Sequence, residues 1–222
     1  MAFTFSIVML LIFAACVGFT FAEGLWSNAV RLINVVTAAI LAMSFFEPVA
    51  KLLDESVGDS YTYFWDFIAL WGLFALFIVI FRVLTDTMSR VKVRFMTIVD
   101  RIGSVVLAVL MGWVMLGFTM TTLHTAPLAE KFWGGAFDYN TTMLLVGPDR
   151  QWLGFFTHLS RGSFSRGLAE EEFARYRASA AEPLAVFDPP PSTFMPTYAS
   201  RRKAVQGMAD SGSFRTTAAP KR

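Results

Sequence analysis

Residues 102–123 form an apolar run that is long enough to cross a lipid bilayer and contains no charged residue. A helix rises about 1.5 Å per residue, so roughly 20 apolar residues cross the hydrocarbon core. Asp100 and Arg101 come just before this run, and His124 follows it. A buried helix of a soluble protein would show a polar stripe at helical spacing, and this run shows none. It therefore predicts a membrane span.

The composition supports a membrane protein and excludes several other classes. Hydrophobic residues make up 55% of the chain and charged residues 16%, whereas soluble domains carry about 25% charged residues. The net charge of +2 is too small to argue for nucleic acid, and no nucleic-acid-binding motif accompanies it. Cys16 is the only cysteine, so no intrachain disulfide can form. His124 and His158, the only histidines, lie in unrelated segments, which argues against a metal site.

Three further apolar runs predict membrane spans, at residues 3–22, 29–46 and 63–84. The first could instead be a cleaved secretory or lipoprotein signal, but no Lys or Arg precedes it, so an uncleaved span is favoured. Arg31 and Asn34 interrupt the first turns of the second run. A helix lying partly in the membrane interface is the alternative for this second run.

A proline and two charged residues indicate where the second and third spans end. Pro48 disfavours helical geometry at the residue before it, so we expect it to mark the exit of the second span. Asp66 and Arg82 fall near the two ends of the third span, where a charge costs little because it reaches the interface.

The connection between the third and fourth spans is basic. Arg90, Lys92 and Arg94 alternate with apolar residues, which fits a short extended stretch, and Arg101 follows. Lys and Arg near spans are retained on the cytoplasmic side, so this connection is predicted inside and both termini outside. Basic residues here also attract anionic lipid headgroups, but a topology signal without a bound ligand is the favoured interpretation.

The remainder of the chain differs in composition. Residues 129–181 form an aromatic-rich juxtamembrane segment that could lie in the headgroup layer or pack on the bundle, with a short helix at 168–181. Residues 182–222 are rich in Pro, Ser, Thr and Arg and are predicted to be a disordered tail. The predicted fold is an all-α membrane protein: a four-span domain at residues 1–128, followed by a largely irregular or disordered C-terminal tail.

Small residues in the fourth span predict a helix contact. Ser104, Ala108 and Gly112 recur every four residues and so share one face, where their size lets two backbones approach closely. The partner helix could belong to this chain or to a second copy, and a partner within the chain is favoured.

The charges near the spans suggest an ion pair. We hypothesise that Arg31 pairs with Asp100 and anchors the second helix to the start of the fourth, because an unpaired charge at that depth is costly. The alternative is that Arg31 extends its guanidinium group to the lipid headgroups.

No catalytic constellation, phosphate-binding glycine loop or metal cluster can be drawn from these residues. The chain is therefore predicted to be no enzyme and to bind no cofactor, metal or nucleic acid. Its expected partners are the lipid bilayer and, through self-association or other membrane proteins, further helices.

Four short spans, a basic connection and Asp100-Arg101 leading into small residues at four-residue steps resemble the colicin V production protein family over about residues 3–128. In that family glycines follow the Asp-Arg pair at those steps, and here only Gly112 keeps the glycine. The resemblance implies a multi-pass protein of the bacterial inner membrane, linked to toxin production or export and to envelope maintenance.

The sequence thus predicts a non-enzymatic accessory protein of the bacterial cytoplasmic membrane. The alternative is a small oligomeric channel or transporter, for which the polar residues in the spans are few: Asn34, Thr119, Thr121 and Thr122. A tail that binds an extracytoplasmic partner is a third possibility.

Overall fold

The structure is a computed structural model that describes residues 2–57, 62–88, 96–128, 147–161 and 194–210. These ranges contain helices and no strand, and the helices are α1 (Ala2–Phe21), α2 (Leu25–Val57), α3 (Thr62–Met88), α4 (Thr97–Thr125), α5 (Pro148–Arg161) and α7 (Phe194–Asp210). The predicted all-α class is confirmed. The basic residues Arg90, Lys92 and Arg94, and the helix predicted at 168–181, lie outside the described residues.

The first four helices are long and apolar enough to cross a membrane, and their candidate spans are Thr4–Phe21, Leu25–Ser56, Phe64–Met88 and Thr97–Thr125. Large apolar side chains face outward from them. Leu10 of α1 is 63% exposed, and Leu76 and Val79 of α3 are 53% and 60% exposed. Water would strongly disfavour such a surface, whereas hydrocarbon is its natural solvent. The chain is therefore a multi-pass membrane protein.

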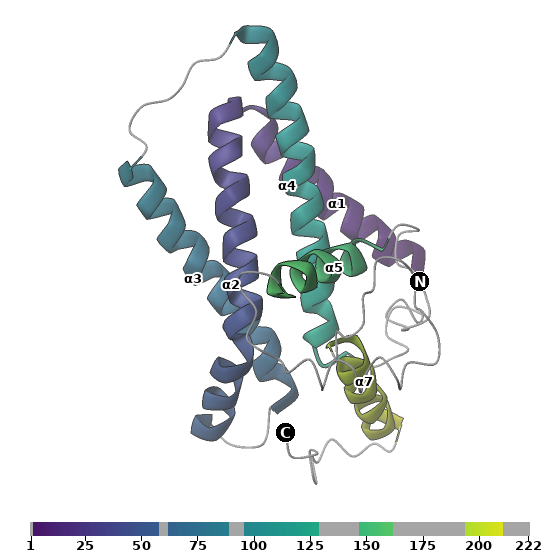
Figure 1. The fold of residues 1–222 in the computed structure, drawn as a ribbon. Helices are drawn as coiled ribbons and strands as arrows, with labels where there is room; N and C mark the ends of the chain where they lie inside the picture. The colour runs from purple at the N-terminus through teal and green to yellow at the C-terminus, as the bar shows by residue number, and fades with distance from the viewer. Residues whose placement is uncertain (1, 58–61, 89–95, 129–146, 162–193, 211–222) are drawn as a thin grey trace.

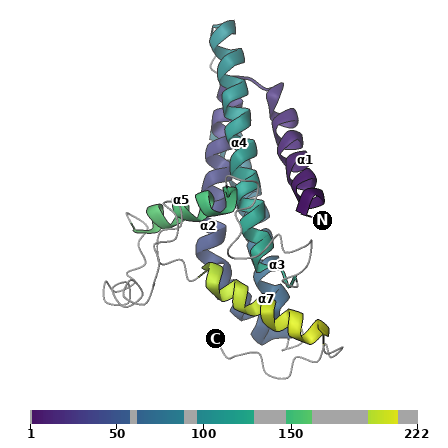
Figure 2. The same ribbon diagram turned by 90° about the vertical axis from the view of Figure 1, so that its right-hand side faces the viewer.

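The helices form one bundle with two distinct ends (Figure 1). α2 packs along α3 and α4, and α1 packs on α4. The turn from α1 to α2 lies beside the start of α4, and we call this the Asp100 end. The start of α3, the last turn of α4 and helix α7 lie at the opposite end, which we call the His124 end (Figures 1 and 2).

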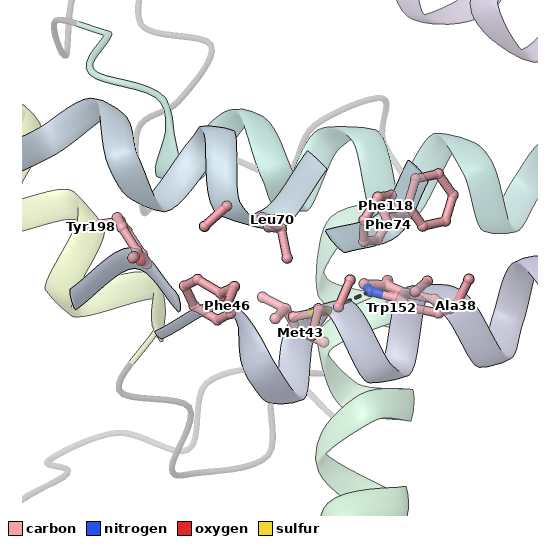
Figure 3. Close-up of a cluster of buried hydrophobic side chains, with 13 residues drawn as sticks. Ala38, Met43, Phe46, Leu70, Phe74, Phe118, Trp152 and Tyr198 are labelled. Carbon is pink, nitrogen blue, oxygen red and sulfur yellow. Dashed lines mark hydrogen bonds between the residues drawn. The ribbon is translucent and has the colours of Figure 1, made fainter. Parts of the chain in front are cut away.

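The main apolar core joins five helices (Figure 3). Ala38, Ala39 and Ala42 of α2 are fully buried, and such small side chains allow close approach of a neighbouring helix. Phe74 of α3 and Phe118 of α4 pack with ring centroids 4.3 Å apart. The same cluster contains residues from the two C-terminal helices, Trp152 of α5 and Tyr198 of α7.

Helix α2 continues through Pro48 and ends at Val57, so the expectation that helical geometry is interrupted before Pro48 is wrong. A proline inside a helix removes one backbone hydrogen bond. Burial on both sides of it outweighs this loss, since Phe46 is 3% exposed and Ala50 is fully buried. The 33 residues of α2 make a helix about 50 Å long. This exceeds a hydrocarbon core of about 30 Å, so α2 projects beyond it.

Helix α7 lies within residues 182–222, so the prediction of a disordered tail is corrected for 194–210. The Pro- and Ser-rich composition of the tail hides a helical pattern. Phe194, Tyr198 and Arg202 recur every four residues, and this face packs on the bundle. α5 likewise lies within the aromatic-rich segment, and it packs on α4.

Gly112→Leu is predicted to destabilise the packing of α1 on α4. A Cβ atom on Gly112 would lie 2.9 Å from Val17 Cγ2 and 3.0 Å from the Phe13 ring, both on α1. Overpacking of this kind costs about 1–3 kcal/mol. Thermal unfolding of the purified protein in detergent should show a lower melting temperature.

Gly72→Leu is the matched control, because a Cβ atom on Gly72 of α3 meets no other group within 4 Å. Its melting temperature should stay close to that of the wild type. Equal losses in the two variants would contradict a specific contact between α1 and α4.

Candidate functional site

At the Asp100 end, the side chain of Asp100 caps the N-terminus of α2. Its Oδ1 accepts a hydrogen bond from the backbone N–H of Leu25 at 2.9 Å. Leu25 begins α2, and the first N–H groups of a helix have no partner within it. A carboxylate at this position also interacts favourably with the positive end of the helix dipole. Asp100 thus fixes α2 to α4, whereas the neighbouring Arg101 is exposed.

The hypothesis that Arg31 pairs with Asp100 is wrong. Arg31 Nη1 lies 2.6 Å from Glu23 Oε1, and both side chains are about a third exposed, at 38% and 34%. Glu23 lies in the turn just before α2, so the two residues are close along the chain. The carboxylate of Asp100 instead serves the backbone of Leu25. Asp100 therefore does link α4 to α2, but through a backbone amide.

Two further polar side chains, the amide of Asn28 and the hydroxyl group of Ser104, form hydrogen bonds between helices at the Asp100 end. Asn28 is fully buried, and its Nδ2 donates to the carbonyl of Thr20 and to Ser104 Oγ, each at 2.9 Å. Ser104 Oγ in turn donates to the carbonyl of Glu23. Carbonyl groups at a helix end lack partners within the helix. Asn28 and Ser104 therefore satisfy the end of α1 and join it to α2 and α4.

The small residues that share one face of α4 lie toward the other helices of the bundle. Ser104 is 4% exposed, Ala108 is fully buried, and Gly112 lies against Val17 and Phe13 of α1. The structure therefore brings Ser104 and Gly112 to other helices of the same chain.

At the His124 end, three buried side chains form a second network. His124 Nε2 lies 3.1 Å from Asp149 Oδ2, and His124 Nδ1 lies 2.7 Å from Arg202 Nη1. Each side chain is at most 3% exposed. Because they come from α4, α5 and α7, the network ties both C-terminal helices to the last span.

The partners of His124 determine which ring nitrogen carries the proton. A guanidinium group has donors only, so Nδ1 accepts from Arg202. Nε2 then carries the hydrogen and donates to the carboxylate of Asp149. The imidazole is neutral in this arrangement, and the charges of Arg202 and Asp149 balance each other on its two sides.

Asp149 is ionised at neutral pH. Its burial alone would raise the pKa of the carboxyl group. Hydrogen bonds from His124 and from the backbone of Arg150, together with the electrostatic influence of these two residues, outweigh burial, so the pKa of Asp149 lies below its ordinary value of 3.8. The negative charge that balances Arg202 is therefore maintained.

Asp66 forms a neighbouring pair with α7. We expected Asp66 to lie near a membrane interface, and the structure shows its side chain buried within the protein, at 2% exposure. Its Oδ2 accepts a hydrogen bond from the Tyr198 hydroxyl at 2.9 Å and pairs with Arg201. Burial and the charge of Asp66 raise the pKa of Tyr198, so the hydroxyl keeps its proton and remains a donor. The Arg201 guanidinium also lies 4.8 Å from the centre of the Tyr198 ring.

The position of α5 places Asp149 beside His124. Gly147 has a φ of 59°, a conformation that glycine adopts readily, and α5 begins at the next residue. A Cβ atom on Gly117 of α4 would lie 2.8 Å from the Pro148 carbonyl oxygen, so α5 starts directly against α4. Farther along, Trp152 Nε1 donates to Met43 Sδ at 3.0 Å. Figure 2 shows α5 starting beside α4 and projecting from the bundle at a steep angle to the long helices.

Sequence reasoning missed the residues at the His124 end, because their partners lie far away in the sequence. A signal was present in α7, where the residues of one face recur every four positions. Asn28 could have been found as a polar residue shortly before an apolar run. No group of three or more His, Cys, Asp or Glu suited to a metal ion occurs in the part of the chain that the structure describes.

Four apolar helices joined by buried polar contacts define a multi-pass helical membrane protein. The family model of the colicin V production protein matches residues 5–141, which include all four spans and more than half of the chain. The chain belongs to the colicin V production protein family, and the resemblance seen over residues 3–128 is confirmed. Searches of curated proteins and of solved structures find no match.

Asp149→Asn is predicted to destabilise the protein, because it removes the buried carboxylate that accepts the hydrogen bond of His124 Nε2. A hydrogen bond to a charged group contributes about 1.5–3 kcal/mol. The matched control is Asp86→Asn, whose exposed pair with Arg82 spans 3.8 Å and whose loss costs less than about 0.5 kcal/mol. Thermal unfolding in detergent compares the two variants.

The pH dependence of this difference gives a second measurement. The pKa of Asp149 is lower in the folded state, so its stabilising effect is complete above the ordinary value of 3.8. It is lost as the pH falls through the folded pKa. The advantage of the wild type over Asp149→Asn should therefore shrink only below that ordinary value. An advantage already lost near neutral pH would contradict the assignment.

Proposed function

We propose that this protein is a non-enzymatic accessory factor of the bacterial cytoplasmic membrane, acting in the production or secretion of a colicin V-type toxin and in envelope homeostasis. The observation that carries the proposal is the family match over residues 5–141. A protein of this kind acts by holding or recruiting other components, so its own helices need firm mutual contacts.

The buried polar groups support a structural role for these residues. Asp100 and Asn28 serve backbone groups of the turn between α1 and α2. Asp66 and Asp149 are each engaged with side chains of another helix. Such contacts fix helix positions, which is the role that an accessory membrane protein requires.

We further propose that both termini face away from the cytoplasm. Arg90, Lys92, Arg94 and Arg101 surround the connection from α3 to α4, whereas the connection from α2 to α3 follows a single Lys51. Lys and Arg in short connections are retained inside. The Asp100 end would then face the cytoplasm, and α5 and α7 would lie on the outer side.

Reporter fusions test this orientation. Alkaline phosphatase needs an oxidising compartment to form its disulfides, so a fusion after Arg222 should be active and a fusion after Met88 inactive. A cytoplasmic fluorescent protein fused at the same positions should give the opposite pattern. Activity of the phosphatase after Met88 would refute the proposed orientation.

Deletion and complementation test the accessory role. A deletion strain should secrete less colicin V-type toxin and survive detergent less well, and the wild-type gene should restore both. We expect Asp66→Asn, Asp149→Asn and Asp100→Ala to lower complementation only in proportion to the amount of protein in the membrane. A variant that reaches the wild-type amount but fails completely would instead indicate a catalytic group.

Flux measurements address the channel or transporter alternative. Liposomes that contain the purified protein should show no added flux across a broad panel of solutes. A flux that disappears in Gly112→Leu would favour the transporter and contradict the accessory role.

A further inference from the structure

The hydrogen bonds at the His124 end are compatible only with the neutral form of the His124 ring. Arg202 donates to Nδ1 over 2.7 Å, and a guanidinium group cannot accept a hydrogen bond. If Nδ1 gains a proton, two donors of like charge face each other at this distance. Asp149, on the other side of the ring, then faces an opposite charge. Protonation therefore strengthens the contact of His124 with α5 and repels α7.

We propose that α7 is a pH-controlled latch: the neutral ring of His124 holds Arg202 and keeps α7 on the bundle, and protonation of the ring expels Arg202 and releases α7. The switch requires no motion of α4 or α5, because Asp149 remains a partner of His124 in both states. Release frees the end of the bundle that α7 covers at neutral pH.

Charged and titratable groups face the latch from each helix packed against it: Asp149 and Arg150 from α5, Tyr198, Arg201 and Arg202 from α7, Asp66 from α3 and Glu47 from α2. Two cations and one anion thus act on the ring of His124 itself. The contact with Arg202 requires the neutral ring, so the latch is closed while the ring is neutral.

A small pocket borders the latch. It lies between the end of α4 and α7, and His124, Pro127, Tyr198 and Val205 contribute to its lining. The ring itself is 1% exposed. If the outward orientation proposed above holds, the latch responds to the pH outside the cytoplasm.

Release would uncover a surface that is hidden at neutral pH. The Phe194 ring of α7 packs edge-on against Phe46 of α2, with ring centroids 6.4 Å apart. Phe46 is 3% exposed in the closed state, and Asp66 beside the Tyr198 hydroxyl is 2% exposed. Release of α7 would therefore expose both Phe46 and Asp66.

Distances between spin labels test the latch in the full chain. Lys51 on α2 and Lys203 on α7 are exposed, so Lys51→Cys and Lys203→Cys can carry labels in a Cys16→Ser background. Double electron–electron resonance in lipid nanodiscs should show one narrow distance at about pH 8. At about pH 4.5, below the ordinary range of histidine titration, a second, broad distribution should appear. It should disappear when the pH is raised again.

The two histidines of the chain provide a matched pair of variants. In His124→Gln, the amide can accept from Arg202 and donate to Asp149 but does not titrate, so the narrow distance should persist in acid. His158 is exposed on α5, and His158→Gln should respond to pH as the wild type does. A pH response that survives His124→Gln, or one that disappears in His158→Gln, would overturn the proposal.

Two further measurements keep the proposal testable if His124→Gln does not fold. Arg202→Met lacks the donor to His124, so its labels should show the broad distribution already at neutral pH; an unchanged pH response in this variant refutes the latch. Circular dichroism should show the same helix content across the pH range, since release is not unfolding. Loss of helix content together with the distance change would also refute it.

Discussion

Hydrocarbon offers no hydrogen bonds, and this constraint explains where the polar groups of the bundle lie. A polar group inside the membrane must find its partner within the protein. At the Asp100 end, Asp100, Asn28 and Ser104 satisfy backbone groups that the helix ends leave open. Between the ends, Asn34 of α2 donates to Thr85 of α3 at 3.0 Å. The polar residues of the spans therefore determine how the helices are placed beside one another.

The two ends meet this constraint with different chemistry. At the Asp100 end, the carboxylate of Asp100, the amide of Asn28 and the hydroxyl group of Ser104 join the helices, largely through backbone atoms. At the His124 end, the adjacent arginines of α7 have different partners: Arg201 pairs with the buried Asp66, and Arg202 contacts His124, whose other ring nitrogen contacts Asp149. Hydrogen bonds to backbone atoms hardly respond to pH, whereas a histidine between two charges does. We therefore call the Asp100 end the fixed joint, because its described contacts between helices contain no histidine. We call the His124 end the adjustable joint, because under the latch proposal its contact with α7 depends on pH.

The sequence predicted what depends on neighbouring residues and failed where the partner is distant. Apolar runs predicted four spans, because the length of an apolar helix is a local property. The interior position of Pro48 was missed, because burial of Phe46 and Ala50 against other helices decides it. The partner of Asp66 could not be found without knowing that α7 returns to α3. Arg31 is the exception, because its partner Glu23 lies close to it along the chain and was overlooked.

The extent of the family match separates these two joints further. Residues 5–141 contain the whole Asp100 end, together with Asp66 and His124, whereas Asp149 and α7 lie beyond the matched segment. The fixed joint therefore belongs to the part of the chain that defines the family. The adjustable joint is completed by residues outside that part, since Asp149 and Arg202 supply the charges on both sides of His124. Regulation by α7 would thus be added to the shared membrane domain without changing how its four spans are held together.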